Sequence, residues 1–83
     1  MINIIHIKDL KKTISYLAEK EIDLKDITIR EPYERLDNYV YIRGIIIQDE
    51  ILKKEDRENI LRVISSLEYI ANEELTERAY GFR

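Results

Sequence analysis

The chain has 83 residues, enough for one domain (residues 1–83) with a small core. Its composition, 45% apolar and 37% charged, is that of a globular protein and excludes a disordered one. The lack of cysteine excludes disulfides and thiolate metal sites, and the net charge of −3 argues against a general nucleic-acid-binding protein, whose surface carries an excess of basic side chains.

No apolar run approaches the length of about 18 residues that a membrane-spanning helix needs. Met1 is followed by no apolar segment of the signal-peptide type. We therefore expect a soluble, cytoplasmic protein.

The first twenty residues are compatible with two readings. Apolar residues at a spacing of three and four predict a helix that begins at Ile4 or Lys8 and ends at Lys20. Alternatively, the apolar run of residues 2–7 forms an additional strand ahead of that helix. His6 is the only histidine and has no second ligand at a metal-binding spacing, so no metal site is expected.

Residues 27–47 predict an antiparallel β-hairpin. Two runs rich in β-branched and aromatic residues, 27–33 and 39–47, flank a polar segment, 35–38, that reads as a four-residue loop. Side chains of a strand alternate between its two faces. The face expected to cover the core consists of Ile27, Ile29, Tyr33, Val40, Ile42 and Ile46.

The outer face of this predicted hairpin is the main candidate for a functional surface. The same register places Arg30 directly opposite Arg43, a like-charge pair that costs a few tenths to about 1 kcal/mol. One explanation is that Glu34 bridges the pair or that both guanidinium groups extend into water. The other is that an anion or acidic partner binds between the two guanidinium groups. The outer face also carries Tyr39 and Tyr41.

Residues 54–79 predict the longest helix. The positive end of the helix dipole stabilises the acidic residues in its first turns, and Gly81 is a signal for the end of the helix. Its buried stripe is expected to comprise Ile60, Val63, Ile64, Leu67, Ile70, Ala71 and Leu75. Because Glu74 and Arg78 continue this stripe, the last two turns are expected to project beyond the rest of the domain. Tyr69 lies on the opposite face, which is either a contact surface or a solvated one.

Together these elements predict an α+β fold of α-β-β-α order, an antiparallel hairpin packed against two helices, with an extra N-terminal strand as the alternative. Acidic side chains outnumber basic ones by seven to four from Glu19 to Asp37, which gives the domain a mild charge asymmetry. No nucleophile with a neighbouring base and no glycine-rich phosphate loop occurs in the sequence, so neither catalysis nor a cofactor is expected.

The leading functional hypothesis is therefore a non-enzymatic regulator or inhibitor that binds a protein partner by occupying its surface. In size and composition alone, the chain is similar to small bacteriophage inhibitors of host defence or host enzymes. The alternatives are a nucleic-acid contact through stacked tyrosines and adjacent arginines, and a homodimeric scaffold. The candidate partner-binding residues are Arg30, Tyr39, Tyr41, Arg43, Ile45, Ile47 and Tyr69.

Overall fold

The computed structural model of the protein describes the backbone of residues 5–80 and the side chains of residues 5–78. This part of the chain contains four helices and no strand, so the predicted α+β class is wrong and the fold is all-α. The helices are α1 (Ile7–Glu19), α2 (Leu24–Thr28), α3 (Pro32–Gln48) and α4 (Lys54–Tyr80). Within residues 5–80, no helix is both long and apolar enough to cross a membrane.

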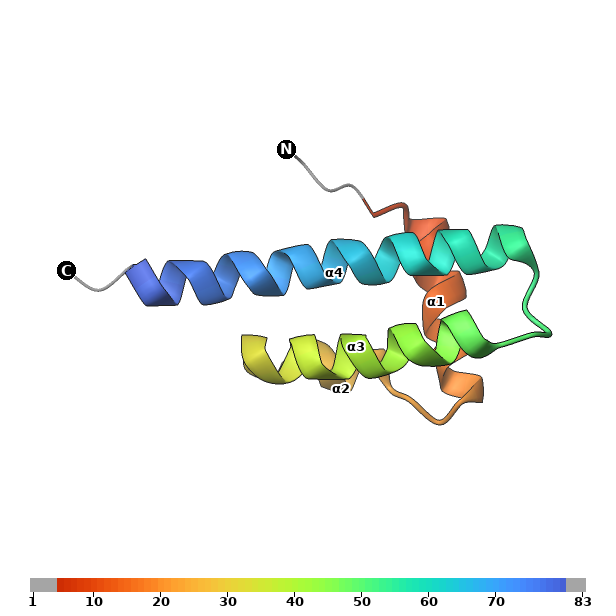
Figure 1. Ribbon diagram of the computed structural model, residues 1–83, viewed down its shortest axis with the longest axis horizontal. Coiled ribbons are helices and arrows are strands. Elements are labelled where there is room, and N and C mark those ends of the chain that lie inside the picture. The colour runs from red at the N-terminus through yellow and green to blue at the C-terminus, as the bar shows by residue number, and fades with distance from the viewer. Residues whose placement is uncertain (1–4, 81–83) are drawn as a thin grey trace.

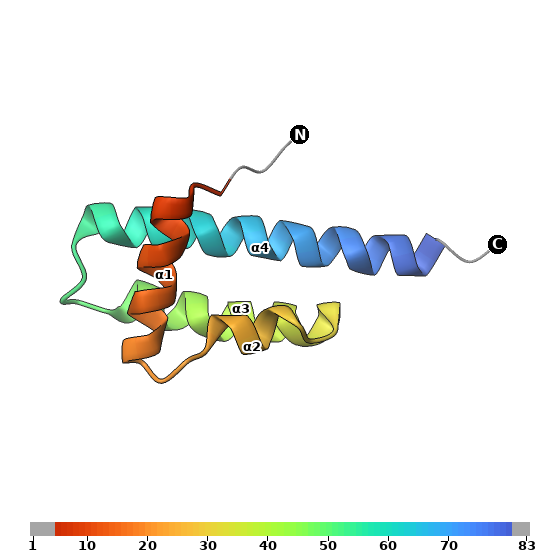
Figure 2. The same ribbon diagram turned by 180° about the vertical axis from the view of Figure 1, so that it is seen from behind.

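The fold has two layers. Helices α3 and α4 form an antiparallel pair, and α1 crosses one side of that pair near the α3–α4 connection (Figure 1). Seen from behind, α1 and α2 lie in front of the pair, with α2 running beside α3 (Figure 2). The opposite side of the α3–α4 pair carries no other helix in the described part of the chain.

The segment predicted as a hairpin, residues 27–47, instead forms the end of α2, a short connection and nearly all of α3. Pro32 occupies the first turn, where its fixed φ suits a helix and its missing N–H costs nothing. Glu34 Oε1 accepts a hydrogen bond from the Glu31 N–H at 3.2 Å, which satisfies a donor at the helix start. The predicted loop, residues 35–38, lies inside this helix.

The helical period reverses two of the predicted faces. Tyr39, expected on the outside, is 1% exposed, whereas Val40, expected in the core, is 66% exposed. Ile42 and Ile46 are buried as predicted, because a spacing of four residues keeps one face in a helix and in a strand alike. Of the three residues that the first run was expected to contribute to the core, only Ile27 is buried, whereas Ile29 and Tyr33 are 81% and 59% exposed.

The core joins all four helices. Its buried members are Leu17 from α1, Leu24 and Ile27 from α2, Tyr39, Ile42 and Ile46 from α3, and Ile60, Ile64 and Ala71 from α4. The predicted helix over residues 54–79 is confirmed. Of its predicted stripe, Ile60, Val63, Ile64 and Ala71 are buried, Leu67 is half-buried, and Ile70 and Leu75 are exposed. The predicted N-terminal helix is confirmed with a start at Ile7. Residues 5 and 6 are not in a strand, and the rest of the alternative strand, like Gly81, lies outside the described residues.

The C-terminal end of α4 extends beyond the start of α3, and two ion pairs tether it there (Figures 1 and 2). Arg35, with a side chain 9% exposed, pairs with Glu74 at 2.8 Å, and Arg78 pairs with Glu31 at the start of α3. The end of α4 therefore projects as predicted, although Glu74 and Arg78 are held by ion pairs. Charged residues continue the apolar stripe because they meet charged residues on the facing helix.

Asp49 organises the connection between α3 and α4. Its carboxylate accepts hydrogen bonds from the Tyr16 hydroxyl at 2.6 Å and from the backbone N–H groups of Ile51 and Leu52 at 3.0 and 3.2 Å, and Lys20 lies 3.4 Å away. The Tyr16 hydrogen bond is the main cause that lowers the pKa of Asp49 to about 2. Burial, followed by the same hydrogen bond, raises the pKa of Tyr16 to about 12.

This pKa shift predicts an acid-sensitive contribution to stability. Because the folded state lowers the pKa of Asp49 from 3.8 to about 2, its stabilising effect is complete above about pH 4 and is lost as the pH falls towards 2. The melting temperature of the wild type should therefore fall more steeply between about pH 4 and pH 2 than that of Asp49→Asn. At pH 7 the variant should have the lower melting temperature. If the melting temperatures of the two proteins fell equally with pH, the ionisation of Asp49 would not be coupled to folding.

Candidate functional site

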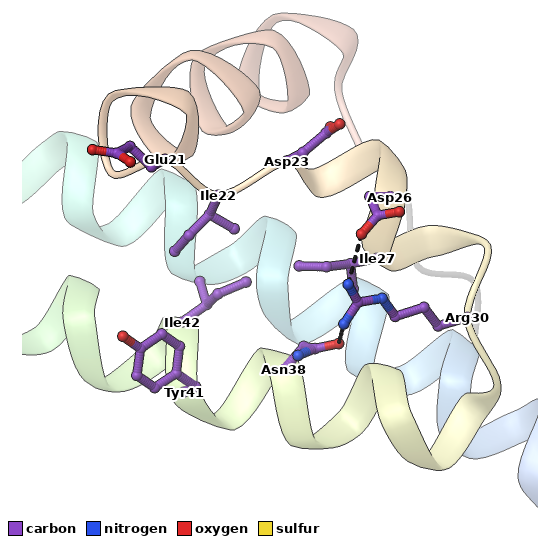
Figure 3. A pocket seen from close by; sticks show the side chains of 9 residues that line it. All are labelled: Glu21, Ile22, Asp23, Asp26, Ile27, Arg30, Asn38, Tyr41 and Ile42. Carbon is purple, nitrogen blue, oxygen red and sulfur yellow. Dashed lines mark hydrogen bonds and ion pairs between the residues drawn. The ribbon is translucent and has the colours of Figure 1, made fainter.

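The candidate site is an open cavity of about 320 Å³ between α2 and α3 (Figure 3). Ile22, from the α1–α2 connection, and Ile27, from α2, project toward Ile42 of α3, and together the three side chains form an apolar floor. Tyr41 forms part of the α3 wall, and 67% of its surface is exposed. The residues that line the cavity are Glu21, Ile22, Asp23, Asp26, Ile27, Arg30, Asn38, Tyr41 and Ile42.

The turn after α1 sets the position of Ile22. The Ile22 N–H donates to the Leu17 carbonyl and the Glu21 N–H donates to the Ala18 carbonyl, the pair of bonds that ends a helix in a Schellman motif. This motif needs a left-handed residue, and Glu21 fills that place with φ of 62°. A residue with a Cβ costs about 1 kcal/mol or more there, whereas glycine does not. Glutamate is thus kept at the cavity rim in spite of backbone strain.

Arg30 closes one end of the cavity and is already neutralised. Its guanidinium donates to Asp26 at 2.6 Å and to the Asn38 side-chain oxygen at 3.2 Å, which ties the end of α2 to α3 (Figure 3). Glu21 and Asp23 take part in no ion pair within residues 5–80. Asp23 uses Oδ1 to accept the Lys25 N–H at 3.0 Å, as the cap of α2. The rim therefore carries an uncompensated negative charge.

A second, shallower depression continues this surface along α1. Its volume is about 250 Å³, and it shares Glu21, Ile22 and Asp23 with the cavity. The remainder of its lining is apolar and includes Ile14 and Leu24. The two depressions make one concave surface that is apolar at its base and acidic at its edge. Such a surface fits an apolar side chain flanked by basic residues.

The structure brings together only two of the predicted partner-binding residues, Arg30 and Tyr41. Tyr39 is buried in the core. Arg43 lies across the α3–α4 interface, where it pairs with Glu68. The predicted opposition of Arg30 and Arg43 is therefore wrong, and the tyrosine–arginine surface proposed for nucleic acids does not form.

The remaining predicted residues lie on three other surfaces. Ile45 is half-buried beside Lys20 at a separate depression near the α3–α4 connection. Ile47 is 58% exposed on α3, and Tyr69 is 41% exposed on α4. No group of three or more His, Asp or Glu side chains in the described part of the chain is placed to hold a metal ion.

The sequence did not predict the apolar floor of the cavity, because Ile27 and Ile42 were both assigned to the core face of a hairpin. The one sequence signal for this site was the excess of acidic residues from Glu19 to Asp37, which includes the three carboxylates at the rim. Comparison of the chain with known protein families, with characterised proteins and with solved structures gave no match.

Proposed function

We propose that this protein is a non-enzymatic regulator that binds a protein partner through the cavity between α2 and α3. The observation that carries the proposal is a concave surface with a floor of three isoleucines and a rim where Glu21 and Asp23 form no ion pair with any side chain that the structure describes. The segment bound there presents an apolar side chain to the floor and Lys or Arg side chains to Glu21 and Asp23. By holding that segment, the protein blocks or recruits its partner without any chemistry of its own.

The chemistry of the cavity supports an apolar anchor with basic neighbours. Burying an apolar side chain of the partner against Ile22, Ile27 and Ile42 removes apolar surface from water, at about 25 cal/mol per Å². The exposed ring of Tyr41 adds contact area at a small cost in side-chain entropy, which is why tyrosine is frequent in binding surfaces. Rim charges contribute little affinity but select the partner and accelerate its association.

An unbiased library of displayed peptides tests this proposal directly. Selection on the wild-type protein should enrich peptides with one large apolar residue flanked by Lys or Arg. A selected peptide should bind Tyr41→Ala about tenfold more weakly, whereas Tyr69→Ala should bind it as the wild type does, since α4 contributes no residue to the cavity.

A substitution at Glu21 distinguishes an effect on binding from an effect on folding. Glu21→Gly should stabilise the fold by about 0.5–1 kcal/mol, because glycine removes the left-handed strain, and should still weaken the selected peptide about two- to fivefold. Failure to enrich any peptide, enrichment of acidic peptides, or equal loss of binding in Tyr41→Ala and Tyr69→Ala would overturn the proposal.

A further inference from the structure

Asn38 presents a hydrogen-bond donor to the cavity that no described residue uses. Its side chain lines the cavity from α3, and Oδ1 accepts a hydrogen bond from Arg30 Nη1 at 3.2 Å. Because a guanidinium group only donates, the Asn38 atom that faces Arg30 must be the oxygen. The other atom of the amide, Nδ2, therefore points away from Arg30 and into the cavity (Figure 3).

Nδ2 of Asn38 has no partner in the described part of the chain and is open to solvent. It donates to no residue that the structure describes. Within the same residues, the only buried side-chain nitrogen or oxygen without a partner is Nε of Arg35, so Nδ2 is not a buried atom. A molecule bound in the cavity can therefore reach it.

Asp26 and Arg30 fix the direction of this donor. Asp26, on α2, accepts a hydrogen bond from Arg30 Nη2 at 2.6 Å, while Nη1 of the same guanidinium holds Oδ1 of Asn38, on α3. One guanidinium thus joins the two helices that enclose the cavity and holds the amide of Asn38 in one orientation. A donor whose orientation is set before binding loses little conformational entropy when a partner arrives, which favours its use in recognition.

The charge of the cavity decides which kind of acceptor Nδ2 meets. Glu21, Asp23 and Asp26 line the same cavity, so a carboxylate or phosphate is repelled and a neutral acceptor is favoured. In a peptide whose apolar side chain lies on the isoleucine floor, the nearest neutral acceptor is a main-chain carbonyl, which every residue carries. The donor and the floor together therefore fit the main chain and one side chain of the same segment.

We propose that the partner segment binds in an extended conformation and that a main-chain carbonyl beside its apolar anchor accepts a hydrogen bond from Asn38 Nδ2. This inference rests on the proposed function and adds the conformation of the bound segment. A carbonyl inside a helix already accepts the N–H four residues later, whereas a carbonyl of an extended segment is unpaired. The unpaired carbonyls at a helix end carry the negative end of the helix dipole, which the acidic rim repels.

Asn38→Asp separates the donor from the structural contact. The carboxylate keeps the acceptor for Arg30, so the variant should melt within a few degrees of the wild type, but it replaces Nδ2 by an oxygen. A peptide selected on the wild type should bind this variant at least about fivefold more weakly, although the added negative charge favours a basic peptide. Asn59→Asp is the matched control, because Asn59 also accepts from an arginine, Arg62, but lies outside the cavity. It should bind the peptide as the wild type does.

Esters in the peptide test the carbonyl itself. Replacing one amide by an ester weakens the carbonyl as an acceptor and keeps all side chains. One position in the peptide should weaken binding to the wild type about three- to fivefold and have little effect on binding to Asn38→Asp, as expected for two groups in direct contact. On the wild-type protein alone, a peptide held in a helix by a side-chain cross-link should bind more weakly than its linear form.

The outcomes distinguish this inference from the proposed function. Equal binding of the peptide by the wild type and Asn38→Asp, an ester scan without a coupled position, or tighter binding of the cross-linked helix would each overturn the extended conformation. The proposed function would stand, since it is judged by the selection and by Tyr41→Ala. Failure to select any peptide would overturn both.

Discussion

Tyr39→Ala should lower the free energy of unfolding by about 3–5 kcal/mol, the largest effect that we expect of any single substitution in this chain. Tyr39 is 1% exposed and is the largest fully buried side chain in the core. Its removal leaves a cavity between α3 and α4 that the surrounding helices cannot fill. A domain of this size has only about 5–10 kcal/mol of stability, so the variant should lose about half of it and unfold at a much lower urea concentration than the wild type.

The adjacent Val40 provides the matched control. Because Val40 is 66% exposed, Val40→Ala should change the free energy of unfolding by less than about 0.5 kcal/mol when urea unfolding is followed at dilute protein, where self-association does not contribute. A hairpin would reverse this order, since Val40 would then face the core. A larger loss for Val40→Ala than for Tyr39→Ala would contradict the helical fold.

Arg57→Met should destabilise the protein by about 1.5–3 kcal/mol, because it removes the group that completes the end of α3. The guanidinium donates hydrogen bonds to the carbonyl of Ile46 and, at 3.2, 2.7 and 3.1 Å, to those of Ile47, Asp49 and Leu52. The last carbonyls of a helix have no partner within it and carry partial negative charge. One cation therefore satisfies the end of α3 and fixes the connection to α4.

Two further variants separate the hydrogen bonds of Arg57 from its charge. Arg57→Lys should recover less than half of the loss in urea unfolding, since an ammonium group cannot reach four carbonyls in different directions. Arg62→Met, which loses only an exposed hydrogen bond to Asn59, should change stability by less than about 0.5 kcal/mol. If Arg57→Lys behaved as the wild type, charge alone would explain the role of Arg57.

Helices α1 and α4 could be predicted from the sequence because their apolar residues follow the helical period. In α4, Ile60, Val63, Ile64 and Ala71 recur at spacings of three and four and are buried. The stripe failed only toward its C-terminal end, at Ile70 and Leu75, which are 41% and 39% exposed. There α4 has passed the region where α1 crosses it, and α3 meets it through Arg35 and Glu31 instead.

Helix α3 could not be predicted because apolar residues lie on every side of it. Its buried face needs Tyr39, Ile42 and Ile46, and its exposed side adds Val40 and Ile47, so the combined pattern resembles a strand. Packing between α2 and α4 overrides the β-propensity of these residues. The signals that favoured a helix were local, namely Pro32 and the acidic residue two positions later at the helix start.

The assignment of α3 to a hairpin also explains why only some of the predicted site residues lie together. Arg30 and Tyr41 do share a surface, but the contact is made by α2 packing on α3 rather than by neighbouring strands. The buried guanidinium of Arg35 was assigned to a loop because its partner, Glu74, is 39 residues away in the sequence. Pairings of this kind follow from tertiary structure and have no local signature.

The central claim is that residues 32–48 form one helix with Tyr39 inside and Val40 outside. Backbone NMR assignment of this segment tests it most directly, through the ¹³Cα shifts and the contacts between amide and Hα protons. We expect positive ¹³Cα secondary shifts from Pro32 to Gln48, without a break at residues 35–38, and contacts between Hα of each residue and the amide proton three residues later. Negative shifts over residues 39–47, together with a cross-strand contact between the Hα protons of residues 30 and 43, would contradict it.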